Sequence, residues 1–231
     1  TEQEWLQIEE AQLAAATNGV LFKDSNQAFS KIRSMLQQGY PEAVRLRRLA
    51  QETAWMAQRG QYNVPRLLQR NDNLTTMLAF SHFAESAMRA AHLCARSYAP
   101  YYKWLLHSTE QLPQGAELAA LLQKSTTLPL EQWETEIIAP VCAIIAKQMK
   151  EQGISTQEES YMQVHAEAAA QQAALLEQKE ALVEKIVRLE FSEFDKVKNE
   201  GVRAGCQDDW ETFSIMRKSQ YLTWELPMLE Q

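Results

Sequence analysis

The sequence predicts an all-α protein, a multi-helix bundle with long antiparallel helices. Apolar residues recur at spacings of three and four along most of the 231 residues, which is the pattern of helices with one buried face. Glycine and proline number only 7 each, so turns are few and the elements between them are long. A fold of many short strands would need more turn residues than this.

The first forty residues predict two short helices around a turn. A first helix fits residues 2–15. Asn18-Gly19 is a turn signal, and residues 20–22 fit a short strand or an extended connection. Ser25 is placed to cap a second helix, and Gly39 suits its C-terminal end.

Longer helices follow. A helix fits residues 41–58, because its leading proline suits a first turn. We expect Gly60 to interrupt the pattern and another helix to begin near Pro65. An apolar stripe at helical spacing covers residues 72–97, and residues 100–104 predict a short helix that opens with a proline.

The second half predicts one break and one very long helix. Pro140 lies inside the apolar run 130–150 and predicts a kink or a break there. Residues 155–158, Ser-Thr-Gln-Glu, match a capping box. The segment after them is rich in good helix formers and predicts a helix to about Asn199. A last helix fits residues 207–221.

We expect two parts, because so long a helix is unusual within one globular unit. Residues 1–153 are assigned to a helical bundle domain. Residues 154–231 are assigned to a long helix and a partial second helical domain.

Composition argues against several classes of function. The net charge of −7 repels phosphate backbones, so nucleic-acid binding is not expected without a basic patch. Three cysteines without a CxxC pair favour reduced thiols in a cytoplasmic protein. No apolar run approaches the roughly 18 residues that cross a bilayer. Without metal-ligand spacing, a Gly-rich phosphate loop or a GxSxG sequence, we expect no metal site and no catalytic residue.

A first polar cluster pairs two arginines on one predicted helix face. Two guanidinium groups on one face can hold a phosphate or a carboxylate. The alternative is a solvated face or internal salt bridges with Glu52 and Asp72. The candidate substrate-binding residues of this cluster are Tyr62, Asn63, Arg66 and Arg70.

A second cluster holds four aromatic residues within residues 98–104, around a proline. Such rings could stack on a nucleobase or a sugar, with Lys103 near a phosphate. The alternative is a hydrophobic corner that closes the end of a bundle. The candidate substrate-binding residues here are Tyr101, Lys103 and Trp104.

A third cluster lies near the C-terminus and is the densest polar segment of the chain. A cysteine close to a helix N-terminus can have a lowered pKa and act as a nucleophile. The neighbouring acidic residues compete, because they also favour a helix N-terminus, and we prefer helix capping. The residues of this second candidate site are Arg203, Cys206, Asp208 and Arg217.

Residues 18–113 resemble the helical domain of unknown function that follows the catalytic domain in a group of bacterial nucleotidyltransferase-like proteins. That domain is similar to the C-terminal helical domain of aminoglycoside nucleotidyltransferases, which packs against an α/β domain and helps to close the substrate cleft. The α/β domain binds magnesium and nucleotide through Gly-Ser and paired aspartates, which this chain lacks. The resemblance rests on Asn18-Gly-Val-Leu-Phe-Lys-Asp24, Tyr40-Pro41, Gln61-Tyr62-Asn63, Arg66, Arg70, Asp72, Tyr98-Ala-Pro-Tyr-Tyr-Lys-Trp104 and Leu112-Pro113.

Residues 180–224 resemble the start of another bacterial domain of unknown function. Val202 stands where that family usually has a second glycine. The family continues well beyond this point, so we expect the chain to be a piece of a larger protein. The resemblance rests on Glu190-Phe, Phe194, Asn199-Glu-Gly, Arg203-Ala-Gly-Cys206-Gln-Asp-Asp209, Phe213-Ser-Ile-Met-Arg217, Ser219-Gln220 and Trp224.

Together these resemblances imply an accessory, substrate-binding helical domain of a nucleotidyltransferase-like protein that is not catalytic alone. Magnesium and nucleotide would come with a separate catalytic domain, because two-metal phosphoryl transfer needs carboxylates that this chain lacks. The alternative is a helical protein-interaction or scaffold module without a small-molecule substrate. The expected partners are that catalytic domain, another protein or a second copy.

Overall fold

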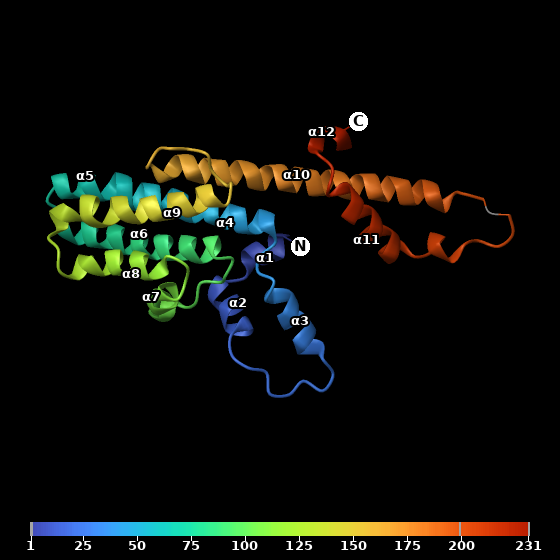
Figure 1. The fold of residues 1–231 in the computed structure, drawn as a ribbon, viewed down its shortest axis with the longest axis horizontal. Helices are drawn as coiled ribbons and strands as arrows, with labels where there is room; N and C mark the ends of the chain where they lie inside the picture. Colours follow the sequence, from blue (N-terminus) through green and yellow to red (C-terminus); the bar gives the residue numbers. More distant parts are fainter. Residues whose placement is uncertain (1, 199, 231) are drawn as a thin grey trace. The chain divides into compact units, whose positions relative to one another are not determined.

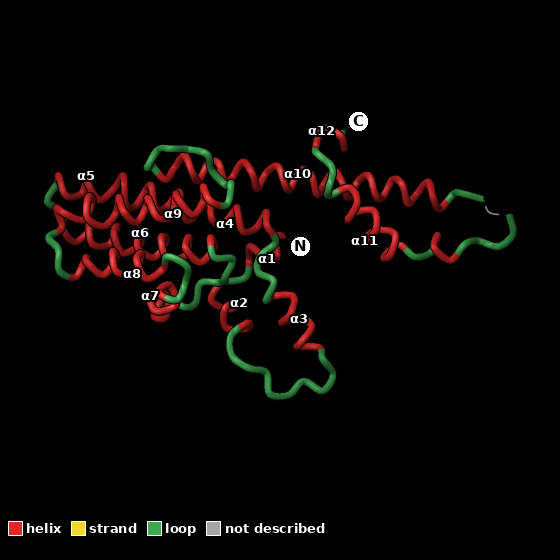
Figure 2. Tube along the Cα trace, viewed as in Figure 1, coloured by secondary structure: helices red, strands yellow, loops and turns green. Residues whose placement is uncertain are grey.

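The computed structural model describes residues 2–198 and 200–230, and every regular element within these ranges is a helix. Figure 1 shows these helices in chain order, and Figure 2 shows the loops that connect them. The prediction of an all-α, multi-helix fold is therefore confirmed. The chain divides into two compact units, Thr1–Ala173 and Ala174–Gln231, and each is described separately below.

The first unit is a bundle built around two long antiparallel rods. One rod runs without interruption through α4 (Glu42–Trp55), the π-helix η1 (Met56–Asn63) and α5 (Val64–Gln69). After a short turn, α6 (Asn73–Cys94) runs back along it and contacts all three. Asp72 starts α6, because its carboxylate accepts a hydrogen bond from the backbone N–H three residues later at 3.1 Å.

Three further helices pack around α6. These are α7 (Tyr102–Glu110), α8 (Gly115–Gln123) and α9 (Ala139–Glu151). Helix α7 begins at Tyr102, so Pro100 does not open it as predicted, and it continues past the predicted end at residue 104. Short elements connect α8 to α9, namely the 3-10 turns η2 (Lys124–Thr126) and η3 (Leu130–Gln132) and the π-helix η4 (Glu134–Ile138). The apolar core of the bundle includes the fully buried Leu46, Leu49, Met56, Phe83, Leu93, Leu105, Leu118, Ile137, Ile145 and Met149.

Both π-helices lie where the sequence predicted a break. Gly60 does not interrupt the rod as predicted, but lies buried inside η1. A Cβ at Gly60 would lie 2.3 Å from the ring of Phe83, so the missing side chain allows α6 to approach the rod. The break predicted at Pro140 takes the form of η4, which ends just before α9, and Pro140 lies in the first turn of α9.

The N-terminal segment forms two helices, where the sequence predicted one. These are α1 (Glu2–Gln7) and α2 (Glu10–Thr17). Residues 20–22 are the extended connection that was one of two predicted alternatives, and they lead to α3 (Ala28–Leu36). We call residues 18–36 the arm. Figure 1 shows α2 and α3 projecting from the bundle of the first unit.

The capping box predicted at residues 155–158 is wrong. These residues form a loop, and α10 (Met162–Asp195) begins after it. The Ser155 hydroxyl instead bonds Nδ1 of the buried His165 at 2.8 Å, while Nε2 of the same ring bonds the Glu159 carbonyl at 2.9 Å. Because a carbonyl only accepts, Nε2 donates the second of these hydrogen bonds. The imidazole thus ties the loop to α10.

The second unit contains the C-terminal part of α10, the 3-10 turn η5 (Gly205–Gln207), α11 (Trp210–Tyr221) and α12 (Leu226–Leu229). Its small core joins α10, α11 and α12, and partly buried aromatic side chains extend this core. The buried core residues are Val183, Val187, Tyr221 and Leu229.

Two helix boundaries of the second unit differ from the prediction. Helix α10 ends at Asp195, whereas the predicted end, Asn199, lies outside the described residues. Helix α11 begins at Trp210 instead of residue 207, because Asp209 provides its cap. Among the residues that the structure describes, no helix combines the length and the apolar character that crossing a membrane requires.

Candidate functional site

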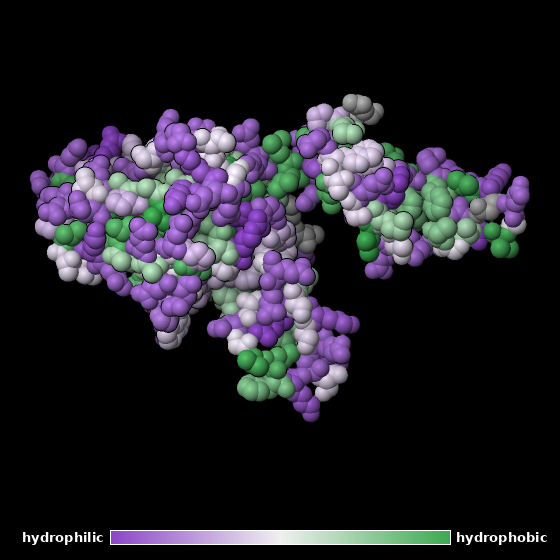
Figure 3. All heavy atoms as spheres, viewed as in Figure 1, coloured by the Kyte–Doolittle hydropathy of each residue, from purple (hydrophilic) through white to green (hydrophobic). Residues whose placement is uncertain are grey.

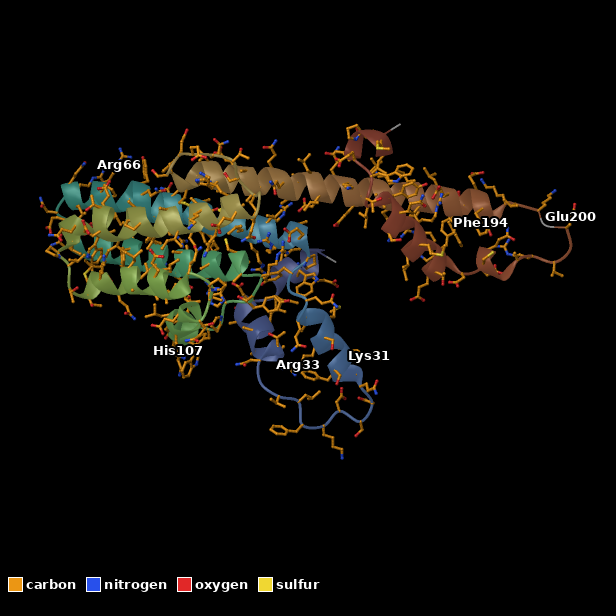
Figure 4. The ribbon with its side chains drawn as sticks, in the orientation of Figure 1. Lys31, Arg33, Arg66, His107, Phe194 and Glu200 are labelled. Carbon is orange, nitrogen blue, oxygen red and sulfur yellow. The ribbon has the colours of Figure 1, made fainter. Side chains whose placement is uncertain are left out.

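The seven candidate substrate-binding residues form two groups on the first unit. The first group lies along the rod, with Tyr62 and Asn63 on η1, Arg66 on α5 and Arg70 just after α5. The second group lies at the start of α7 and consists of Tyr101, Lys103 and Trp104. Figure 4 labels Arg66 and His107, which belongs to α7, and they lie on opposite sides of the bundle. One small ligand therefore cannot contact both groups within a single copy.

In the first group, Tyr62 holds the Arg66 guanidinium. The Arg66 guanidinium carbon lies 4.4 Å from the centre of the Tyr62 ring, and Arg66 donates a hydrogen bond to the tyrosine hydroxyl. The acidic residues weighed as salt-bridge partners have other roles, since Asp72 caps α6 and Glu52 accepts a hydrogen bond from Ser86. Arg66 remains exposed, so its charge is available to an anion.

The second group is an exposed aromatic surface at the start of α7, formed by Tyr101, Tyr102, Lys103 and Trp104. The exposed fractions of the tyrosines are 55% and 65%, and that of Trp104 is 58%. The Lys103 ammonium lies 5.6 Å from the centre of the Trp104 ring. These rings do not close the end of the bundle, so the alternative of a hydrophobic corner is wrong for them. We call this the α7 surface.

Tyr98, the fourth aromatic residue of the cluster, does pack against the bundle, as the hydrophobic-corner alternative predicts. Its hydroxyl donates to the Leu36 carbonyl at 2.7 Å, and its ring meets the Tyr40 ring edge-on at 4.8 Å. Tyr98 therefore fastens the base of the arm to the bundle.

A groove of about 660 Å³ lies between α10, η5 and α11 in the second unit. Two residues of the second candidate site, Cys206 and Arg217, line it. Its other lining side chains are mainly apolar or acidic. They are Leu189, Glu190, Glu193, Phe194, Asp209, Thr212, Phe213 and Met216.

An ion pair forms part of the groove wall. The Arg217 Nε donates to Glu190 at 2.9 Å, and the Tyr221 hydroxyl donates to the same carboxylate at 2.5 Å. These hydrogen bonds, the one from Arg217 first, lower the pKa of Glu190 and raise the pKa of Arg217. Glu190 is therefore ionised at neutral pH and already neutralises the only basic residue of the groove lining.

The other two residues of this site, Arg203 and Asp208, hold the loop that carries Cys206. Arg203 donates to Asp208 at 2.8 Å, to the Asp195 side chain and to the Gln207 carbonyl at 3.0 Å. The buried Gln207 side chain donates in turn to the last turn of α10. Cys206 is exposed. Asp209 accepts the Thr212 N–H at 3.0 Å, as expected of a helix cap.

Sequence reasoning missed a buried polar cluster that joins α2, α4 and α6 in the first unit. Glu10 is 6% exposed, and the Arg89 guanidinium lies 3.2 Å from it and 2.8 Å from Glu85. Burial raises the pKa of Glu10, and it raises the pKa of the nearby Glu52 to about 7. We call Glu10, Tyr40, Arg48, Glu52 and Arg89 the buried cluster.

Several polar atoms of the buried cluster have no hydrogen-bond partner among the described residues. These are Oε1 of Glu10, the Tyr40 hydroxyl, Nε of Arg48 and Oε2 of Glu52. Burial also raises the pKa of Tyr40. The signal that could have revealed the cluster is a charge among the apolar residues of a helical stripe, as with Arg89 beside Met88 and Ala91.

No group of three or more potential metal ligands comes together within residues 2–198 and 200–230. The fold and the candidate sites thus define a helical protein of two units with exposed apolar side chains. In comparisons with known proteins, residues 5–105 match the family model described as "Domain of unknown function (DUF4037)". Residues 180–231 match the model described as "Protein of unknown function (DUF4125)". No curated protein and no solved structure matches the chain.

Proposed function

We propose that the first unit is an accessory helical domain that packs against a nucleotidyltransferase-type catalytic domain and does not catalyse alone. Magnesium and nucleotide would bind to that catalytic domain, which supplies the carboxylates for metal-assisted phosphoryl transfer. The resemblance of residues 18–113 supports this proposal, and the family match over residues 5–105 covers most of the same segment. The reduced cysteines support a cytoplasmic location.

The α7 surface is the observation that carries the proposal. Large aromatic side chains seldom remain exposed together on a folded monomer, and they are enriched at the centres of protein interfaces. Tyr101, Tyr102 and Trp104 also combine a large apolar area with a polar tip, which suits a contact that is only partly dry. Lys103 adds a cation, so the partner surface should offer aromatic or aliphatic groups beside a carboxylate.

Arg66 then serves as an anion-binding group on another side of the same domain. Because Tyr62 holds its guanidinium, the side chain loses less conformational freedom when it binds a phosphate or a carboxylate. The α7 surface is assigned to the partner protein and Arg66 to the substrate.

The test is a calorimetric titration of this protein with a purified nucleotidyltransferase-type domain from the same host, with magnesium and nucleotide present. Trp104→Ala should raise the dissociation constant by about tenfold or more, as expected of an aromatic residue at an interface centre. Leu74→Ala is the matched control, because Leu74 is 71% exposed and lies on another helix of the same unit. Equal affinities of Trp104→Ala and the unmodified chain would refute the α7 contact.

The second candidate function is a helical interaction or scaffold module without a small-molecule substrate. The exposed apolar arm favours it, because the arm presents a further contact surface. The two functions differ in their response to Arg66→Ala. A weaker affinity of the chain for inorganic phosphate, used as an anion probe, would support the accessory role, whereas an unchanged affinity would favour the scaffold.

A further inference from the structure

We propose that the arm of one copy of this chain docks into the groove between α10 and α11 of a second copy. This contact is independent of the proposed pairing with a catalytic domain, because it uses neither the α7 surface nor Arg66. Four observations lead to it, namely the exposed apolar arm, its internal support, its positive charge, and an apolar groove of opposite charge.

The arm exposes more apolar surface than a loop and a short helix need. Phe22 is 97% exposed and Val20 is 79% exposed. Helix α3 has no buried residue, and its apolar side chains Ile32 and Met35 are more than half exposed. Figure 3 shows apolar atoms gathered at the tip of the hairpin that α2 and α3 form. Exposed apolar side chains gathered in this way favour a contact surface.

The arm is nevertheless held in one shape. The Arg33 guanidinium donates to the carbonyls of Thr17, at 2.9 Å, Asn18 and Gly19, where α2 ends. The Asp24 carboxylate accepts hydrogen bonds from both the N–H and the hydroxyl of Ser30, each at 2.7 Å. Because the loop is already ordered, docking would cost little additional conformational entropy.

The arm and the groove carry opposite charges. In a chain of net charge −7, the arm contains three basic residues, Lys23, Lys31 and Arg33, against the single acidic Asp24. The groove lining contains three carboxylates, Glu190, Glu193 and Asp209, against the single Arg217. Glu190 already pairs with Arg217, and Glu193 forms an exposed ion pair with Lys196 at 2.7 Å. With Lys196 counted, three carboxylates against two basic residues still leave the groove with a negative excess, which suits a cationic partner.

The groove also fits an apolar side chain in size and chemistry. Its volume of about 660 Å³ lies within the range of roughly 300–1,000 Å³ typical of ligand pockets. Phe194 and Phe213 stack in its wall with ring centres 5.5 Å apart, and Met216 is 63% exposed beside them. Phe22 inserted here would gain aromatic and thioether contacts. Lys23, the next residue, would lie near the acidic residues.

A second copy is the partner that these observations favour, because both complementary surfaces lie on the same chain. A dimer in which each arm fills the groove of the other copy is closed and has two-fold symmetry. Each groove is then filled by the other copy.

The experiment measures self-association of the full chain and, in the same samples, the accessibility of Cys206 in the groove. Sedimentation velocity should show a species of twice the 26.5 kDa chain mass at high protein concentration. Iodoacetamide should alkylate Cys206 more slowly as the concentration rises, because the arm covers it. The other two cysteines are buried and do not obscure the signal.

Phe22→Asp should raise the dimer dissociation constant by about tenfold or more and restore rapid alkylation of Cys206. Because Phe22 is almost fully exposed, the variant keeps the fold. Leu74→Asp is the matched control, an exposed apolar residue outside the arm that should leave the dimer intact. Met216→Glu tests the groove and should weaken the dimer as Phe22→Asp does.

Charge reversal tests the pairing itself. Lys23→Glu and Glu193→Lys should each weaken the dimer. Mixing the two variants should restore association, because the mixed dimer has one interface in which both charges are reversed and one in which both are native. A chain that stays monomeric at every concentration would overturn the proposal. So would a dimer that is insensitive to Phe22→Asp, or one in which Cys206 stays fully reactive, because another surface would then hold the two copies together.

Discussion

The buried cluster of the first unit and the ion pair of the groove use the same chemical groups with opposite results. In the cluster, Glu10 faces Arg89 and its pKa is raised, because burial outweighs the attraction. In the groove, Glu190 faces Arg217 and its pKa is lowered, because water still reaches the pair and its hydrogen bonds dominate. Solvent access decides whether a carboxylate next to an arginine favours its charged form or its neutral form.

The difference gives the two units opposite responses to pH. Glu52 has a folded pKa of about 7, above its ordinary 4.5, so the folded state binds more protons than the unfolded state between those values. Its contribution to stability is complete below pH 4.5 and is lost as the pH rises through 7. Glu190 has a lowered folded pKa, so its contribution is present above its ordinary pKa and is lost as the pH falls through the folded value.

Among these substitutions, Arg89→Leu is expected to change the free energy of unfolding most. The change leaves the buried carboxylate of Glu10 without its cation, which should lower the free energy of unfolding of the first unit by about 3 kcal/mol. Urea denaturation followed by amide hydrogen exchange measures this for each unit. The matched control is Lys147→Met, because the ion pair of Lys147 with Glu151 is exposed and contributes little. Losses of similar size in both variants would contradict the role of burial.

Glu52→Gln should have the next largest effect on the free energy of unfolding, and it should raise this free energy instead of lowering it. The amide cannot ionise, so the substitution should stabilise the first unit by about 2 kcal/mol at pH 8. Below pH 4.5 the two proteins should be similar in stability, since Glu52 is then protonated in both the folded and the unfolded state. Chemical denaturation at a series of pH values measures the difference, and a difference that does not change with pH would show that Glu52 is already ionised without cost.

Arg217→Leu in the groove should cost only about 1 kcal/mol at neutral pH, because both partners of its ion pair are about one-third exposed. The loss should shrink in acid, where Glu190 is protonated. Hydrogen exchange in α11 at two pH values measures it. A loss of stability equal to that of Arg89→Leu would mean that the ion pair in the groove wall is as inaccessible to water as the buried cluster.

The smallest effect on stability is expected from alkylation of Cys206. This thiol is exposed, whereas burial raises the pKa of Cys94 to about 12 and also raises that of Cys142. At low protein concentration, iodoacetamide should modify Cys206 first and change the free energy of unfolding by less than about 0.5 kcal/mol. Peptide mass mapping identifies the modified residue, and prior reaction at Cys94 would show that the bundle opens.

Helical periodicity predicted most of the fold, because the spacing of apolar residues encodes which face is buried. It failed where tertiary contacts override local signals. At Gly60 the ring of Phe83 takes the place of a side chain, and at Ser155 the hydroxyl pairs with His165 instead of capping a helix.

The candidate sites show the same limit. Cys206 and Arg217 were grouped from the sequence, and they line one groove because a single turn joins their helices. Arg66 and Trp104 were both predicted to bind substrate, but α7, which carries Trp104 and the labelled His107, lies on the other side of the bundle from Arg66. The buried cluster escaped notice because Glu10 and Arg89 are 79 positions apart, and neither residue reveals its desolvation without its partner.

Two arginines fasten the N-terminal helices, and this has a consequence for folding during synthesis. Arg48 donates to the carbonyls of Trp5 and Ile8 at the end of α1, each at 3.0 Å, and Arg33 holds the end of α2. Helices this short are marginal on their own. Each of these helices emerges from the ribosome before the arginine that holds it. Stable folding of α1 and α2 therefore follows the synthesis of Arg48 and Arg33.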